Sequence, residues 1–140
     1  MKTVYLTRRE RFNAAHQMWN FNWTEEKNIE VFGKCANKNW HGHNYELFVT
    51  VKGEPDLETG YCLDLKEMSR VINERVIDYL DHKNINLEVP FMKGKLASTE
   101  NLTIAIWEEL EEAIQELGAT LHKVRLTETE NNSVEYFGEE

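Results

Sequence analysis

The sequence contains few residues of the kinds that cross-link a chain or anchor it in a membrane. Only two of its 140 residues are cysteine, too few for a disulfide framework, so a reducing cytoplasm is the expected location. No apolar stretch approaches the ~20 residues of a membrane helix, and residues 1–12 lack the apolar core of a signal peptide. Basic residues are also scarce, 16 against 25 acidic ones, which gives a net charge of −9. This balance disfavours nucleic acid and anionic membranes as partners, although a local basic patch can still bind an anionic substrate.

The residues that are present have the composition of one folded domain. The chain is 41% apolar and 29% charged, which argues against a disordered chain. Its length predicts a single domain over residues 1–140, and a domain of this size can hold one core without disulfides.

Hydrophobic periodicity predicts an alternation of strands and helices. Alternating apolar residues indicate strands, and apolar residues three and four apart indicate helices that begin after Asp64 and at Ser98 or Thr99. Residues 17–40 have no period and predict a long loop, a kind of segment that is usually functional. The expected elements are strands at 2–12, 44–53 and 60–63, helices at 65–80 and 99–117, and strands at 121–129 and 133–137 that are joined by a turn at Asn131 and Asn132.

This order predicts an α+β fold. The main strands form a four-stranded antiparallel sheet, and both helices cover one of its faces. A sheet of this kind has two open edges, which proteins usually cover or pair. We therefore expect edge pairing between subunits.

Three of the five histidines are placed as metal ligands. His41 and His43 flank Gly42 at the start of a strand, where residues two apart point to the same face. His16 follows the first strand, which we expect to pair with the second. Three imidazoles on paired strands would leave one coordination position open, as in catalytic zinc sites. A His-x-His pair by itself is also common among ordinary surface or core histidines, and we interpret His122 as structural.

Cys35 lies six residues before His41, and three roles are open for it. It can be a fourth zinc ligand, which would make the site closed and structural. It can be a thiolate that the metal activates, or a small buried hydrophobic residue. Cys62 lies in a short apolar segment and is assigned to the third role.

Other polar residues fit either acid–base chemistry or a structural role. Asp81 can orient His82 for proton transfer, or His82 can complement the dipole at a helix end. Glu128 can accept two N–H bonds from a planar edge such as the 2-amino-pyrimidinone of a pterin or purine. The alternative for Glu128, and for Thr99 and Glu100, is a hairpin carboxylate and a helix cap.

Five segments together resemble one protein family, that of the 6-pyruvoyltetrahydropterin and 6-carboxytetrahydropterin synthases. They occur in the family's order and extend over most of the chain. The matching segments are RFNAAH at 11–16, CANKNWHGHNYE at 35–46, LDHKNIN at 80–86, STENL at 98–102 and TETENN at 127–132.

The resemblance implies a fold, an assembly and a substrate. The fold would be the tunnelling fold, in which subunits pair sheet edges into a trimeric barrel and two trimers stack into a homohexamer. The substrate would be 7,8-dihydroneopterin triphosphate, converted by a zinc-dependent lyase. The implied site residues are His16, His41 and His43 as Zn²⁺ ligands, Cys35 as the catalytic thiol, Asp81 and His82 as a proton relay from across a subunit interface, and Glu128 with Thr99 and Glu100 as the pterin site.

The family has two branches, which differ in the product. One keeps the side chain and gives 6-pyruvoyltetrahydropterin for tetrahydrobiopterin; the other gives 6-carboxytetrahydropterin and acetaldehyde for deazapurine (queuosine) synthesis. The five residues between Cys35 and His41 favour the pyruvoyl branch, because the carboxy branch tends to have three. Candidate cations for the triphosphate, which the sequence does not rank, are Arg9, Arg11, Lys27, Lys34 and Lys38.

Two functions of other classes are also open. In the first, the chain is a non-catalytic zinc module with Cys35 as the fourth ligand, and this leaves Asp81, His82 and the ETENN segment unexplained. In the second, the chain is a zinc hydrolase, because zinc held by three histidines activates water. Nothing in the sequence marks a hydrolytic substrate.

Overall fold

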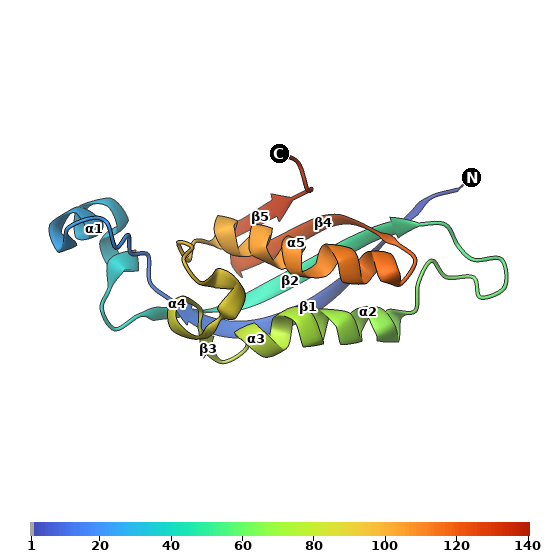
Figure 1. The fold of residues 1–140 in the computed structure, drawn as a ribbon, viewed down its shortest axis with the longest axis horizontal. Helices are drawn as coiled ribbons and strands as arrows, with labels where there is room; N and C mark the ends of the chain where they lie inside the picture. The colour runs from blue at the N-terminus through green and yellow to red at the C-terminus, as the bar shows by residue number, and fades with distance from the viewer. Residues whose placement is uncertain (1) are drawn as a thin grey trace.

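The computed structural model describes residues 2–140 (Figure 1). Four long strands and three main helical segments are joined by turns and by longer loops, such as residues 54–64 between β2 and α2. The elements are β1 (Val4–His16), α1 (Glu25–Phe32), η1 (Gly33–Ala36), β2 (His41–Gly53), α2 (Leu65–Ile72), η2 (Asn73–Ile77), α3 (Asp78–Leu80), β3 (Lys83–Asn84), α4 (Ile85–Glu88), η3 (Pro90–Met92), α5 (Thr99–Glu116), β4 (Thr120–Thr129) and β5 (Asn132–Tyr136).

The sheet has five strands in the order β3-β1-β2-β4-β5, not the four expected. The four long strands are antiparallel, and the added strand β3 pairs in parallel with β1 at Ala14 and Ala15. The chain is held there because the backbone N–H of His82 donates to the carbonyl of Asn13 at 2.7 Å. A strand of two residues has no period, so the hydrophobic pattern does not reveal it.

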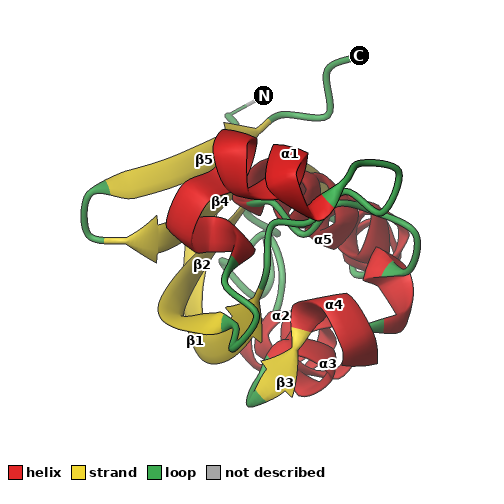
Figure 2. Ribbon diagram, turned by 90° about the vertical axis from the view of Figure 1, so that its left-hand side faces the viewer, coloured by secondary structure: helices red, strands yellow, loops and turns green. Residues whose placement is uncertain are grey.

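The two predicted helices lie on one face of the sheet, with α5 against β4 and β5 and α2 against β1 (Figure 2), whereas α1 extends beyond the end of the sheet (Figure 1). On β2, alternate residues from Tyr45 to Val51 are buried, which confirms the predicted inward face. The helix predicted from Leu65 to Leu80 is continuous through α2, a π-helical turn at η2, and α3. Leu65 itself is exposed, because it lies in the first turn, beyond the edge of the core.

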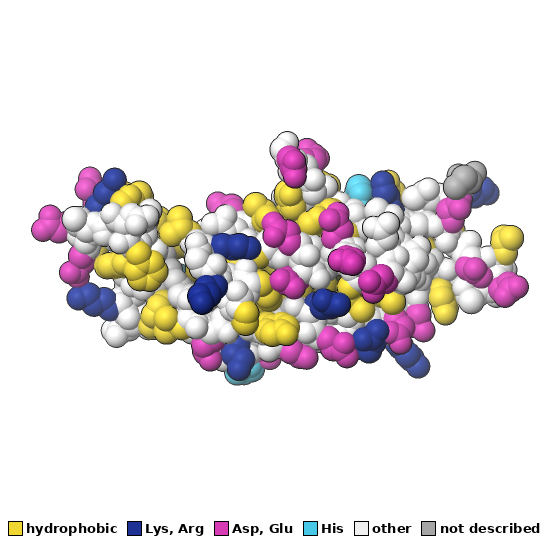
Figure 3. Space-filling view, in the orientation of Figure 1, with side chains coloured by type: hydrophobic (Ala, Val, Ile, Leu, Met, Phe, Trp, Pro, Cys, Tyr) yellow, Lys and Arg dark blue, Asp and Glu magenta, His cyan; other side chains and the backbone are white. Residues whose placement is uncertain are grey.

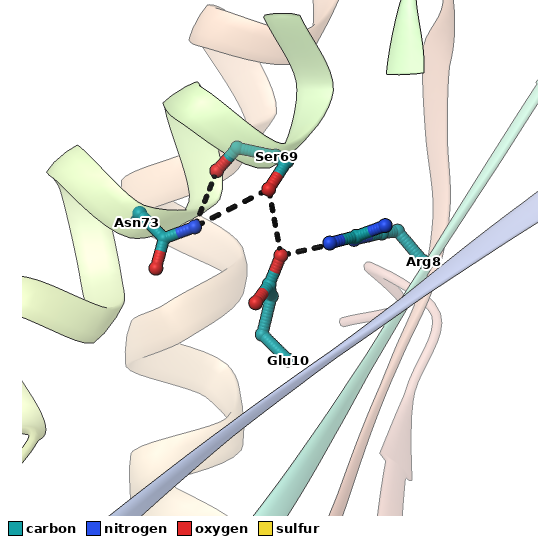
Figure 4. Close-up of polar contacts among 4 residues, drawn as sticks. All are labelled: Arg8, Glu10, Ser69 and Asn73. Carbon is teal, nitrogen blue, oxygen red and sulfur yellow. Dashed lines mark hydrogen bonds and ion pairs between the residues drawn. The ribbon is translucent and has the colours of Figure 1, made fainter. Parts of the chain in front are cut away.

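A polar cluster fixes α2 to β1 (Figure 4). Glu10 Oε1 accepts hydrogen bonds from Ser69 Oγ at 2.8 Å and from Arg8 Nε at 2.9 Å. Asn73 Nδ2 donates to the carbonyl of Ser69 at 2.8 Å, at the residue where the helix widens into η2. The half-buried Glu10 is thus satisfied, and the helix is held in register with the strand.

The segment expected to be a long loop contains a helix. Thr24 begins α1, and its hydroxyl accepts the N–H of Lys27 at 3.1 Å. The buried Asn28 donates to the carbonyls of Asn20 and Thr24, each at 3.0 Å. Polar contacts therefore hold this helix where an apolar stripe would be expected, which is why periodicity missed it.

Two other expectations at turns are corrected. Residues 60–63 form no strand, because the chain turns around Asp56, whose carboxylate accepts the N–H groups of Glu58 at 2.8 Å and Thr59 at 3.0 Å. The final hairpin turns at Glu130 and Asn131, one residue earlier than predicted. No helix of the described residues is long and apolar enough to span a membrane.

Candidate active site

Strand pairing brings three histidines together at one end of the sheet. His16 lies opposite His41 in the β1–β2 register, and His43 lies opposite Ala14. All three belong to the helix-covered set of alternate residues, so their rings converge. Their ligand atoms lie within 4.8 Å of one another, and the ring centroids of His16 and His41 are 4.4 Å apart. These residues are suited to hold one metal ion.

The hydrogen bonds around the histidines leave three nitrogens free for a metal. His16 Nδ1 is 2.7 Å from the carbonyl of Ala97. A carbonyl only accepts, so Nδ1 carries the proton and Nε2 is the free ligand atom. His16 Nε2, His41 Nδ1 and His43 Nε2 are buried without a hydrogen-bond partner in the described structure. Buried polar atoms are normally satisfied, and one metal ion would satisfy all three.

The histidines are also in the protonation state that a metal needs. Burial lowers the pKa of each of the three rings below the ordinary value. For His41 the positive charge of a protonated His16 would lower its pKa further. Neutral imidazole is the form that binds a metal, so the site is prepared for binding near neutral pH.

Glu128 and Thr99 lie beside the histidines. Thr99 Oγ1 donates to Glu128 Oε2, and Glu128 Oε1 is 3.7 Å from His43 Nε2. Thr99 begins α5, and Ser98 is its N-cap, because the Ser98 hydroxyl accepts the N–H of Asn101 at 3.1 Å. Thr99, Glu100 and Glu128 line one hollow of about 310 Å³. The fold therefore brings the three residues expected to bind the pterin to one hollow.

Tyr45 adds a donor that the sequence analysis did not identify. Its side chain is 1% exposed and stacks on Phe12 at 4.8 Å between ring centroids, and its hydroxyl has no partner among residues 2–140. Burial, and then the charge of Glu128, raise the pKa of the phenol, so it stays protonated. The sequence pattern could have identified Tyr45, because it continues the two-residue period of His41 and His43 along the same strand face.

Asp81 and His82 form a pair at the outer edge of β1, apart from the three-histidine cluster. His82 Nδ1 is 3.1 Å from Asp81 Oδ2, and the imidazole is exposed. Asp81 Oδ1 accepts the N–H of Asn13 at 3.0 Å, and this bond is the main reason that the pKa of Asp81 is lowered. His82 has a φ of 60°, in the left-handed region that a non-glycine residue seldom adopts. The strained backbone presents the imidazole to solvent.

The two cysteines lie in different surroundings. Cys35 is exposed in η1 and does not belong to the histidine group. Its carbonyl accepts the N–H of Met18 at 2.7 Å, which ties the segment to the end of β1. Cys62 is partly buried against the hydrophobic core. His122 is distant from the site in the fold and contacts the rings of Tyr5 and Phe137.

The fold and the site together define a class: a small α+β protein with one helix-covered antiparallel sheet and a three-histidine metal-type site at its end. Residues 5–139 match the family model described as 6-pyruvoyl tetrahydropterin synthase. The chain belongs to this family, which confirms the resemblance found in its five segments.

Similar proteins from several eukaryotes extend this finding. A Dictyostelium discoideum protein named 6-pyruvoyl tetrahydrobiopterin synthase is 41% identical over 99% of this chain and 98% of its own length. A Homo sapiens protein of the same name is 39% identical over 96% of this chain and 91% of its own. The solved structure of Caenorhabditis elegans 6-pyruvoyl tetrahydropterin synthase superposes with a TM-score of 0.92 at 34% identity, covering 99% of this chain and 98% of that one.

Proposed function

We propose that this protein is a zinc-dependent lyase that converts 7,8-dihydroneopterin triphosphate into 6-pyruvoyltetrahydropterin and triphosphate. The observation that carries the proposal is the convergence of three unpartnered histidine nitrogens within 4.8 Å, beside a carboxylate held by Thr99. Family membership supplies the reaction class, because the relatives described above are named as this synthase.

His16, His41 and His43 would hold the zinc ion. When bound, it supplies Lewis acidity that favours loss of a proton from the side-chain hydroxyls of the substrate. The protein's own groups then orient the ring. Glu128 accepts N–H bonds from the amino-pyrimidinone edge, and Thr99 fixes the carboxylate from the other side.

Proton transfer is assigned to Cys35 and to the Asp81–His82 pair. The Cys35 thiolate removes a proton from the side-chain carbon, triphosphate leaves, and the pair returns a proton. Oxidation of the side chain balances reduction of the ring at C6 and N5, so the reaction requires no external oxidant or reductant.

A second copy of the chain is required for this chemistry. Asp81 and His82 lie at the outer edge of β1, whereas the histidines lie under the helices of the same chain. The β1 edge from residue 4 to 13 and the outer edge of β5 have no strand partner in the described chain. We propose that these edges pair between copies to form a trimeric barrel, that two trimers form a hexamer, and that each site combines residues from more than one copy.

The pyruvoyl product is proposed over the carboxy product for two reasons. The relatives at about 40% identity are named as pyruvoyl synthases, and five residues separate Cys35 from His41. Both cysteines are free, which supports the proposed cytoplasmic location, where thiols stay reduced.

The test is incubation of purified, zinc-loaded protein with 7,8-dihydroneopterin triphosphate, with the products identified by mass. We expect 6-pyruvoyltetrahydropterin and triphosphate in equal amounts, and no turnover in a His41→Ala control. Acetaldehyde released in near-equal yield with triphosphate would place the chain in the carboxy branch. Absence of any pterin conversion would reject the proposed function.

A further inference from the structure

The helix-free face of the sheet has a hollow at the same end as the histidines. Alternate residues of β1 and β2 point to this face, and the pairs Asn13–Asn44 and Ala15–Gly42 lie opposite one another there. The second pair has almost no side chain, so the surface is low at that position. Two adjoining hollows, of about 470 and 390 Å³, share Asn13, Asn44 and His82 in their linings.

Each of the two hollows has one Lys or Arg in its lining. Lys83 lines the larger part and Arg11 the smaller part, with His82 common to both. Neither Arg11 nor Lys83 has a carboxylate within 4.0 Å among the described residues. The side-chain amides of Asn13 and Asn44 also make no hydrogen bond in residues 2–140, so the lining offers free donors.

The two carboxylates in the lining are already engaged. Glu46 accepts from Arg9 at 3.1 Å, and Asp81 accepts the Asn13 N–H and lies against His82. Arg9 offsets the charge of Glu46, so Asp81 is the one carboxylate of the lining that no Arg or Lys among the described residues pairs with. The two cations without an acidic partner, Arg11 and Lys83, outnumber it. A pair of free cations with amide donors between them is suited to an anion with several oxygens, such as a chain of phosphates.

The other candidate cations are less available. Lys38 pairs with Glu25 at 3.1 Å, and the ammonium of Lys27 lies 4.4 Å from the centroid of the Trp23 ring. Lys34 is exposed in η1, next to Cys35 and away from any of these hollows. Of the five cations considered from the sequence, Arg11 alone both lines a hollow and lacks an acidic partner; Lys83 was not among the five.

We propose that this hollow binds the phosphate tail of the substrate, with Arg11 and Lys83 as its cations and Asn13 and Asn44 as amide donors. The inference rests on the proposed function, which supplies the triphosphate. His43 borders the larger hollow, but the side chains of Asn13 and Asn44 alternate with those of the metal-site histidines and point to the other face of the sheet. We therefore assign the tail to a substrate whose ring is held at the histidines of a neighbouring copy. His82 lines both hollows, so the proposed proton relay faces the same substrate.

The test measures binding of two probes to the zinc-loaded, full-length protein by calorimetry at low salt. The first probe is inorganic tripolyphosphate, and the second is 7,8-dihydroneopterin, which has the ring and side chain but no phosphate. We expect Arg11→Gln and Lys83→Gln each to weaken tripolyphosphate binding about tenfold or more, because each removes a charge-assisted contact. Binding of 7,8-dihydroneopterin should stay within about twofold of wild type, and Arg11→Lys should recover part of the loss.

Lys34→Gln is the matched control, since it removes one exposed cation near Cys35 without touching the hollow. Unchanged tripolyphosphate binding in the Arg11→Gln, Lys83→Gln double variant would overturn the inference, as would an equal loss in Lys34→Gln. Failure of wild-type protein to bind tripolyphosphate would overturn it too. The binding measurement does not depend on turnover. A protein that binds tripolyphosphate through Arg11 and Lys83 but makes no pyruvoyl product would therefore refute the proposed function and still support the anion site. Thermal unfolding of each variant checks that the fold is intact.

Discussion

Glu128→Gln isolates the contribution of one negative charge to pterin recognition. The substitution keeps the shape of the side chain, and the amide oxygen can still accept the hydroxyl of Thr99, which now donates to Glu128 Oε2. What is lost is the charge and one of the two acceptor oxygens. The second of these is Oε1, which lies 3.7 Å from His43 Nε2 and faces the site.

The size of the effect follows from the bonds that the pterin edge would make. A bidentate carboxylate accepts two N–H bonds, and a hydrogen bond to a charged group contributes roughly 1.5–3 kcal/mol. Replacing one oxygen by an NH₂ group removes one such bond, and the new NH₂ donor then faces the N–H donor of the substrate. We therefore expect ring binding to weaken by about ten- to a hundredfold, because 1.4 kcal/mol corresponds to about a tenfold change.

The assay is titration of zinc-loaded protein with 7,8-dihydroneopterin, together with measurement of zinc per subunit. Zinc stoichiometry should not change, since Glu128 does not belong to the three-histidine group. Glu130→Gln is the matched control, because Glu130 is exposed in the adjacent hairpin turn. Wild-type affinity in Glu128→Gln, or an equal loss in Glu130→Gln, would refute the assignment of Glu128 as the pterin anchor.

Four further outcomes are expected. His41→Ala should lose most bound zinc by metal analysis, because it removes one of three ligand nitrogens; full zinc retention would contradict the site. Cys35→Ala should keep zinc and thermal stability but lose turnover, and loss of both zinc and stability would instead indicate a closed structural site. His82→Ala should lower turnover with zinc retained, whereas full activity would favour a structural role for this exposed residue. Asp81→Asn should make stability less sensitive to acid, because the N–H of Asn13 lowers the pKa of Asp81 in the fold. The carboxylate therefore stabilises the protein above its ordinary pKa of about 3.9, and this contribution is lost as the pH falls through the lowered pKa. Unfolding of both proteins measured from pH 7 to pH 2 tests this expectation.

Local pattern was sufficient for the elements that have a strong apolar period. Alternate burial from Tyr45 to Val51 and the helix from Leu65 to Leu80 both follow from side-chain spacing, because each element has one face against the core. The same period placed His41 and His43 on one face of a strand. That prediction needed no knowledge of the partner strand, since residues two apart in a strand share a face.

Pattern was insufficient where polar contacts or pairing between distant segments decide the structure. The helix α1 depends on Thr24 and Asn28, and β3 depends on a backbone bond from His82 to Asn13. Neither feature buries a row of apolar side chains, so neither leaves a period in the sequence.

Residue types and their spacing were enough to identify the groups that carry the chemistry and to place His41 and His43 on one strand face. The position of His16 opposite His41, the contact of Glu128 with Thr99, and the place of Asp81 and His82 at the outer edge of β1 became known from the fold. Strand register and packing set the distances between residues far apart in the chain, whereas side-chain period sets only the direction in which each residue points.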